Sequence, residues 1–124
     1  MSYLDVYVGY LDDSTFSWDG GDWSGNVPKR RSPFLPDGYR VFRVVLERIN
    51  SGEWVGKQTD WGGWVARLSP SEIEQFIDEI YGPPNDDAAL FPGSPHLLVD
   101  LRDLRQFVKE LRRDELYALV ATEL

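Results

Sequence analysis

Carboxylates gather in one short stretch of this chain. Residues 69–87 carry six acidic side chains and no basic one, within a 124-residue chain whose formal charge is −8. A surface of one sign focuses its field on partners of the opposite sign, so we interpret this stretch as a docking surface for a basic protein. The candidate partner-binding acids are Glu72, Glu74, Asp78, Glu79, Asp86 and Asp87.

A simpler reading of these acids is that they keep a surface helix soluble and complement its dipole. That reading suits Glu72 and Glu74 in a first turn, because negative charge is favourable at a helix N-terminus. It does not explain Asp78 and Glu79, which fall toward the negative end of the same helix. No Lys or Arg follows at i+4 to form the usual stabilising pairs, so the sequence leaves these carboxylates without local partners.

Two Gly-Gly segments combine tryptophan with aspartate, at residues 18–23 and 60–64. Glycine pairs let the backbone turn sharply, and the flanking side chains can then project outward. Tryptophan beside aspartate is typical of an interface anchor. It also suits a carbohydrate site, where the indole stacks on a sugar ring. The candidate binding residues here are Trp18, Asp19, Asp22, Trp23, Asp60 and Trp61, whereas we assign Trp54 and Trp64 to the core.

The sequence offers little support for catalysis. His96 is the only imidazole, and no Gly-x-Ser-x-Gly segment exists to present a serine nucleophile. Cysteine is absent, and neither a dinucleotide fingerprint nor a phosphate-binding loop occurs. We therefore expect no catalytic residue and no cofactor, although two carboxylates in a cleft could serve a glycosidase.

The loop aspartates do not predict a metal site. Their spacing departs from the calcium-binding loop, which needs acids at alternating positions and a glutamate at the twelfth. The acids concerned are Asp12, Asp13, Asp19 and Asp22. The one basic cluster, at residues 29–31, is interpreted as a set of intramolecular partners for these aspartates.

Composition narrows the class of protein. A pI near 4.5 argues against nucleic acid and against anionic membranes, since both require a basic face. No apolar run is long enough to span a membrane, and no secretory leader is evident. We expect one cytoplasmic domain over residues 1–124 that is a monomer or a weak homodimer.

A capped helix positions the acidic stretch. Ser69 precedes Pro70, and Glu72 completes a capping box. A stripe of apolar residues faces inward, and Gly82 ends the helix. The spacing therefore predicts a helix over 69–81 whose outer face is acidic.

The other elements follow from periodicity and turn residues. Alternation predicts a half-buried strand at 3–10 and further strands at 40–49, 53–57 and 64–68, with a hairpin turn at 50–52. Residues 11–38, rich in Gly, Pro and Trp, are expected to be irregular. A second helix is expected at about 100–112, with a solvated face that includes Arg105, preceded by an extended segment at 96–99. Residues 115–124 suit a strand buried on both faces, with helical continuation as the alternative.

The expected fold is α+β: a four- to five-stranded, mainly antiparallel sheet packed against two helices. In size, charge and lack of cysteine the chain resembles the small acidic proteins that neutralise bacterial toxins. The first hypothesis is thus an immunity or antitoxin-type inhibitor that covers a basic surface of a partner. The alternative is a small ligand-binding domain or carboxylate-dependent enzyme, for example a carbohydrate-binding one, that uses the Trp/Asp loops.

Overall fold

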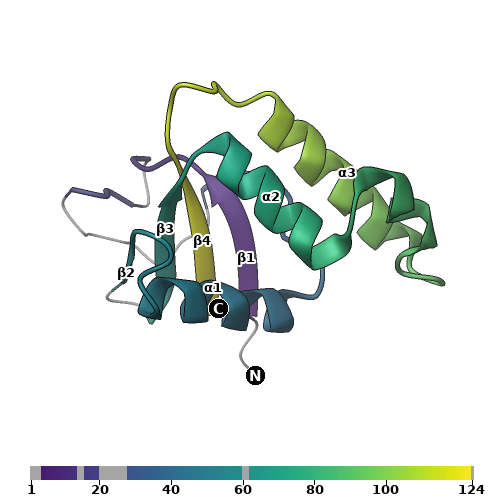
Figure 1. The fold of residues 1–124 in the computed structure, drawn as a ribbon, viewed down its shortest axis with the longest axis horizontal. Helices are drawn as coiled ribbons and strands as arrows, with labels where there is room; N and C mark the ends of the chain where they lie inside the picture. Colours follow the sequence, from purple (N-terminus) through teal and green to yellow (C-terminus); the bar gives the residue numbers. More distant parts are fainter. Residues whose placement is uncertain (1–3, 14–15, 20–27, 60–61, 124) are drawn as a thin grey trace.

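One four-stranded antiparallel sheet, in the order β1-β4-β3-β2, lies at the centre of the molecule (Figure 1). The computed structural model describes residues 4–13, 16–19, 28–59 and 62–123. Its strands are β1 (Leu4–Gly9), β2 (Gly56–Gln58), β3 (Trp64–Leu68) and β4 (Tyr117–Glu123). Its helices are α1 (Gly38–Asn50), α2 (Pro70–Tyr81), α3 (Pro95–Lys109) and a 3-10 helix, η1 (Pro84–Ala89). The α+β class and a mainly antiparallel sheet are confirmed.

The last strand is the most deeply placed one. β4 pairs with β1 on one side and with β3 on the other. Its residues alternate between two apolar clusters: Tyr117 and Leu119 join the helices, whereas Ala118 and Val120 face the opposite way. The prediction of a C-terminal strand buried on both faces is confirmed.

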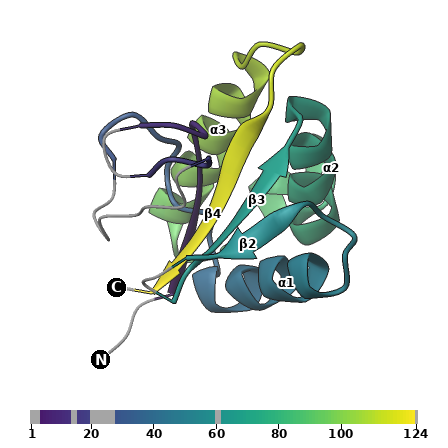
Figure 2. The ribbon, with the colours of Figure 1, turned by 90° about the vertical axis from the view of Figure 1, so that its left-hand side faces the viewer.

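The helices lie on one face of the sheet, and Phe16, Trp18 and Phe34 of the irregular N-terminal segment pack on the other. The larger core joins inward residues of β1, β3 and β4 to apolar residues of all three α-helices. The smaller core joins Tyr7 and Val65 to Phe16, with Trp18 and Phe34 packed against it. Figure 2 shows this arrangement, with α1 and α2 on one side and the irregular segment on the other. Because of this segment, β1 is covered on both faces, and the expectation of a half-buried strand is wrong.

The irregular segment also closes one edge of the sheet. The backbone N–H of Ser32 donates to Val8 O at 2.9 Å, and that of Leu35 donates to Val6 O at 2.8 Å. Val8 N–H in turn donates to Ser32 Oγ at 2.9 Å. These bonds satisfy the outer edge of β1 without a fifth strand.

Residues 38–50 form a helix where alternation predicts a strand. The buried positions are Val41, Phe42, Val45 and Ile49, which form one stripe at helical spacing. Both the alternation of a strand and the repeat of a helix fit this segment, and the β-branched valines favoured the prediction of a strand, which is wrong. Residues 50–52 consequently end α1 instead of forming a hairpin turn: Ser51 N–H donates to Glu47 O, and Gly52 has φ of 82°. The return strand is reduced to the three residues of β2.

The two remaining helices differ in how well the sequence predicts them. α2 has the predicted capping box at Ser69, the proline at its first position and Gly82 at its C-cap. α3 begins at Pro95 and ends at Lys109, so the start predicted near 100 is wrong. Proline is favourable at the first helical position because it lacks the N–H that would be unpaired there. Residues 96–99, including His96, are therefore helical and not extended.

Candidate functional site

The acids of α2 lie on its outer surface, and arginines distant in the sequence hold three of them from the inner side. Glu74 pairs with Arg113 and Glu79 with Arg48. The Oδ1 of Asp78 lies 2.7 Å from Nη1 of Arg105 on α3. The helix has no basic residue at i+4, but the fold supplies the pairing instead. The acids at 74, 78 and 79 are therefore not uncompensated, as the lack of a base at i+4 suggested, because their partners lie on other elements.

Glu72 has a different role from the other acids of α2. Its Oε1 accepts from Ser69 N–H at 3.1 Å, and Ser69 Oγ accepts from Glu72 N–H at 3.2 Å. This reciprocal pair satisfies two of the unpaired donors at the helix start.

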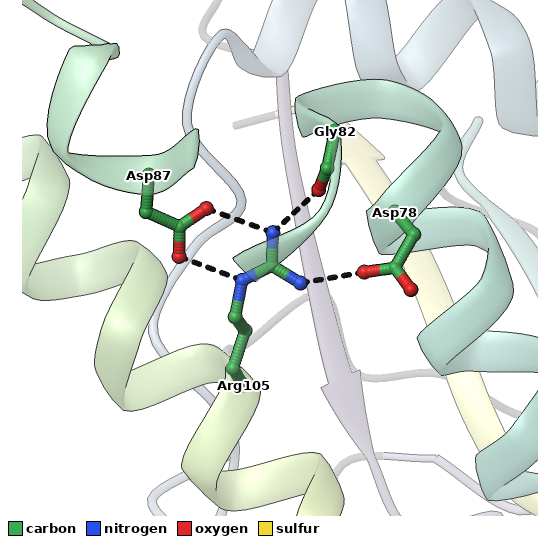
Figure 3. A network of polar contacts seen from close by, with 4 residues as sticks. All are labelled: Asp78, Gly82, Asp87 and Arg105. Atoms are coloured by element: carbon green, nitrogen blue, oxygen red, sulfur yellow. Dashed lines mark hydrogen bonds and ion pairs between the residues drawn. The ribbon is translucent and has the colours of Figure 1, made fainter. Parts of the chain in front are cut away.

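Arg105 is the centre of a polar network that ties α2, η1 and α3 together (Figure 3). Its Nε and Nη2 donate to the two oxygens of Asp87 at 2.8 and 2.9 Å. Nη2 also donates to Gly82 O at 2.9 Å, and Nη1 donates to Asp78. The Asp87 side chain is 7% exposed and that of Arg105 is 16% exposed. The prediction of a solvated Arg105 is wrong, because the turn after α2 folds back over α3.

The network stabilises the charged form of Arg105 in a largely buried position. Burial lowers the pKa of the guanidinium, but the hydrogen bonds to Asp87 and Asp78 outweigh burial and raise the pKa above its ordinary value. Asp87 is consequently an internal ligand of Arg105. Its carboxylate does not point outward with the other acids.

A second arginine anchors the other end of the acidic surface. The guanidinium of Arg48 lies 5.1 Å from the ring centroid of Trp54 and 5.3 Å from that of Phe76, and the two rings meet edge to face. Its Nε also lies 3.5 Å from Glu53 Oε2. Arg48 thus positions both Glu53 and Glu79, and Trp54 belongs to the core as predicted.

Together these residues form a preorganised surface that we call the acidic α2 surface. It comprises Glu53, Glu72, Glu74, Asp78 and Glu79. The four acids with arginine partners have side chains that are 42–61% exposed. Within the described part of the chain, each α2 carboxylate accepts a hydrogen bond through one oxygen, and no hydrogen bond or ion pair involves the other oxygen. The side chain of Asp86 lies outside what the structure describes.

A groove runs beside this surface, between α2 and α3. It has a volume of about 690 Å³. Glu74 and Asp78 line it on the α2 side, whereas Arg102, Arg105 and Lys109 line it on the α3 side. We call it the α2–α3 groove.

Of the Trp/Asp candidates, the structure describes Trp18 and Asp19, and Trp18 packs on the other face of the sheet. Trp18 is half-buried against the smaller core, and Asp19 is exposed. Lys57 Nζ lies 4.6 Å from the Trp18 ring centroid, and Arg67 Cζ lies 5.1 Å from it. Two cations of the chain itself therefore already contact this indole ring. The candidates at positions 22, 23, 60 and 61 lie outside the described residues. The structure does not bring Trp18 and Asp19 together with the acids of α2.

Two aspartates of the irregular segment, Asp12 and Asp13, have local partners. Asp12 Oδ1 accepts from Trp18 N–H at 2.9 Å, and Asp13 Oδ1 accepts from Phe16 N–H at 3.1 Å. These carboxylates shape the loop. Among the described residues, no group of three or more His, Asp or Glu side chains is arranged to hold a metal ion.

The two arginines of the basic cluster at 29–31 stack on aromatic rings. Arg30 lies 4.3 Å from the Tyr10 ring centroid, and Arg31 lies 4.2 Å from that of Phe34. Neither arginine forms an ion pair with a loop aspartate in the described part of the chain. The interpretation of this cluster as a set of intramolecular partners for the loop aspartates stays a prediction, because Asp22 lies outside the described residues.

Sequence reasoning missed four residues of the acidic α2 surface and its support: Arg48, Glu53, Arg105 and Arg113. No local signal marks the three arginines, because their pairs with Glu79, Asp78 and Glu74 join residues 27–39 positions apart in the chain. Glu53 lies close to Arg48 in the sequence, but it falls outside the acidic stretch at 69–87. Comparison of the chain with protein-family models, with curated proteins and with solved structures finds no match. In the described residues, no helix combines the length and apolarity that a membrane crossing requires.

Proposed function

We propose that this chain is a stoichiometric protein-binding module that covers a basic surface of its partner with the acidic α2 surface. Its most concrete form is an immunity or antitoxin-type inhibitor that lies over the basic active site of a toxin in the bacterial cytoplasm. It acts by binding and performs no reaction of its own.

One observation carries this proposal: arginines bind one oxygen each of Glu74, Asp78 and Glu79, while these side chains stay 42–50% exposed. An unsupported glutamate loses rotamer freedom when it binds, at a cost of about 0.5–1.5 kcal/mol for each side chain. Arg48, Arg105 and Arg113 restrict that freedom before the partner arrives. The partner's Lys and Arg can then bind the other oxygens without breaking the bonds to these arginines.

The charge balance supports the same conclusion. Glu53 and the acids of α2 place five negative charges on the surface, against the three arginines that hold them. Exposed ion pairs contribute only about 0–1 kcal/mol each, so the acidic surface serves orientation and association rate more than raw affinity. Steering by such a surface accelerates association and weakens steeply as salt is added.

Neutralising the acidic surface without unfolding the protein tests the proposal. The triple variant Glu53→Gln, Glu74→Gln, Glu79→Gln leaves the Arg105 network intact. The wild-type protein, immobilised at low salt, is expected to retain a basic protein from native lysate. The association rate of that protein, once identified, should fall steeply with ionic strength, and the triple variant should slow it at least tenfold.

A control variant of equal charge change separates the surface from net charge. Glu47→Gln, Asp103→Asn and Glu123→Gln remove three exposed acids that lie outside the acidic α2 surface. This control should retain the partner with nearly unchanged kinetics. Equal effects of the two triple variants, or an association rate independent of salt, would refute the proposal.

A further inference from the structure

The two walls of the α2–α3 groove carry opposite charge. Glu74 and Asp78 form the α2 wall, and each uses only one carboxylate oxygen inside the protein. On the α3 wall, Arg105 is bound internally, whereas the side chains of Arg102 and Lys109 are exposed and have no bonding partner within the described residues. A ligand of this groove therefore meets acceptors along one side and free donors along the other.

The free groups have helical spacing. Glu74 and Asp78 are four residues apart, which is about 6 Å along α2, and Arg102 and Lys109 are seven residues apart, about 10.5 Å along α3. Residues i and i+7 lie on nearly the same side of a helix, so the two bases form one row. A helix lying along the groove can match both rows with side chains at i, i+4 and i, i+7 on its two flanks.

We propose that the α2–α3 groove receives a helix of the partner whose basic flank faces α2 and whose acidic flank faces α3. This inference rests on the proposed function and makes it more specific. The acidic α2 surface alone requires only that the partner be basic. The row of Arg102 and Lys109 adds that carboxylates of the partner lie beside its basic side chains. The two rows together also fix the direction of approach, because a helix placed the other way round would set like charges against each other.

Two helical peptides of defined charge test this inference without the natural partner. Both are Ala-based, of about 20 residues, long enough to be helical in isolation. Both carry Lys at i and i+4 on one flank. The opposite flank carries Glu at i and i+7 in the first peptide and Gln at the same positions in the second. Fluorescence anisotropy at low salt gives the dissociation constants.

The peptide with Glu is expected to bind the wild-type protein about three- to tenfold more tightly than the peptide with Gln, from two exposed ion pairs. The net charge of −8 opposes this preference, so only a local basic row can produce it. Arg102→Gln with Lys109→Gln should abolish the preference. Lys29→Gln with Arg43→Gln, which removes two exposed bases elsewhere, should leave it unchanged.

Three results would overturn the inference. The first is binding of the Gln peptide at least as tight as that of the Glu peptide. The second is a preference that survives removal of Arg102 and Lys109. The third is a wild-type dimer in sedimentation equilibrium that dissociates in the Arg102→Gln, Lys109→Gln variant, since the occupant would then be a second copy of the chain. The proposed function fails separately, if the Glu53→Gln, Glu74→Gln, Glu79→Gln variant associates with the captured basic partner as fast as the wild type does.

Discussion

Removal of the Arg105 guanidinium is expected to destabilise the fold more than the loss of any other ion pair described above. Arg105→Met keeps the apolar stem of the side chain and removes every donor to Asp87, Asp78 and Gly82. Asp87, 7% exposed, then holds a charge with neither a partner nor full hydration. Breaking a buried pair from one side costs about 3–5 kcal/mol.

The geometry lowers that figure somewhat. Asp78 is 50% exposed and regains water when Arg105 is lost, so its bond contributes only about 0–1 kcal/mol. Water also reaches part of Arg105 itself. We therefore expect a loss of about 2–4 kcal/mol from the free energy of unfolding, carried mainly by Asp87.

Urea unfolding followed by tryptophan fluorescence measures this loss. With a slope of about 1–3 kcal/mol/M, the midpoint should fall by about 1–2 M. Arg113→Met is the matched control, since it removes the same group from a pair with Glu74 in which both side chains are nearly half exposed. It should cost less than about 1 kcal/mol.

A double-mutant cycle then assigns the loss to the bidentate pair. Asp87→Asn removes the buried charge, so Arg105→Met should cost less in that background, with a coupling energy of about 1–3 kcal/mol. If Arg105→Met and Arg113→Met cost the same, or if the cycle shows no coupling, the argument that Asp87 depends on Arg105 is refuted.

Two further features of the fold give expected outcomes. A Cβ on Gly38 would lie 2.2 Å from the carbonyl oxygen of Leu4, so Gly38→Ala should cost about 1–3 kcal/mol, as overpacking does. Gly52→Ala, strained at φ +82° but in open space, should cost about 1 kcal/mol. Thermal unfolding compares the stability of the two variants, and a smaller loss for Gly38→Ala than for Gly52→Ala would contradict this expectation. Burial raises the pKa of Tyr7 and of Tyr81, so both phenols stay protonated in the folded protein above pH 10. Because the folded-state pKa of each phenol lies above its unfolded-state pKa, the contribution of the two tyrosines to the free energy of unfolding is complete below about pH 10. This contribution is lost as the pH rises further. Tyrosinate absorbance should show a late step that Tyr7→Phe and Tyr81→Phe each diminish, and an unchanged late step in both variants would contradict this.

Local signals in the sequence predict an element correctly where residues within that element determine its structure. The capping box at Ser69, the proline after it and Gly82 act within a few residues, so α2 was predicted almost to the residue. For the C-terminal segment the sequence favoured a strand over helical continuation, because apolar residues at every position of a short run suit a strand between two layers, and the strand is confirmed.

Local signals failed where tertiary contact chooses between two structures. Residues 38–50 fit both an alternating and a helical period, and the buried stripe of Val41, Val45 and Ile49 selects the helix only once the sheet is in place to pack against it. The same limit applies to charge. The partners of Glu74, Asp78 and Glu79 lie on other elements, and no rule about i and i+4 can find them.

The arginine partners change what the acidity of this chain means. A run of six acids without a base suggests raw negative charge, whose effect would be long-range and nearly independent of position. In the structure, Arg48, Arg105 and Arg113 reduce that charge and fix the direction of the carboxylates that remain half exposed. Fixed direction is what distinguishes recognition from solubility, because a partner then meets oxygens at set positions instead of a diffuse field. For that reason the exposed pairs at Glu53, Glu74 and Glu79 should govern binding, whereas the buried pair at Asp87 should govern stability.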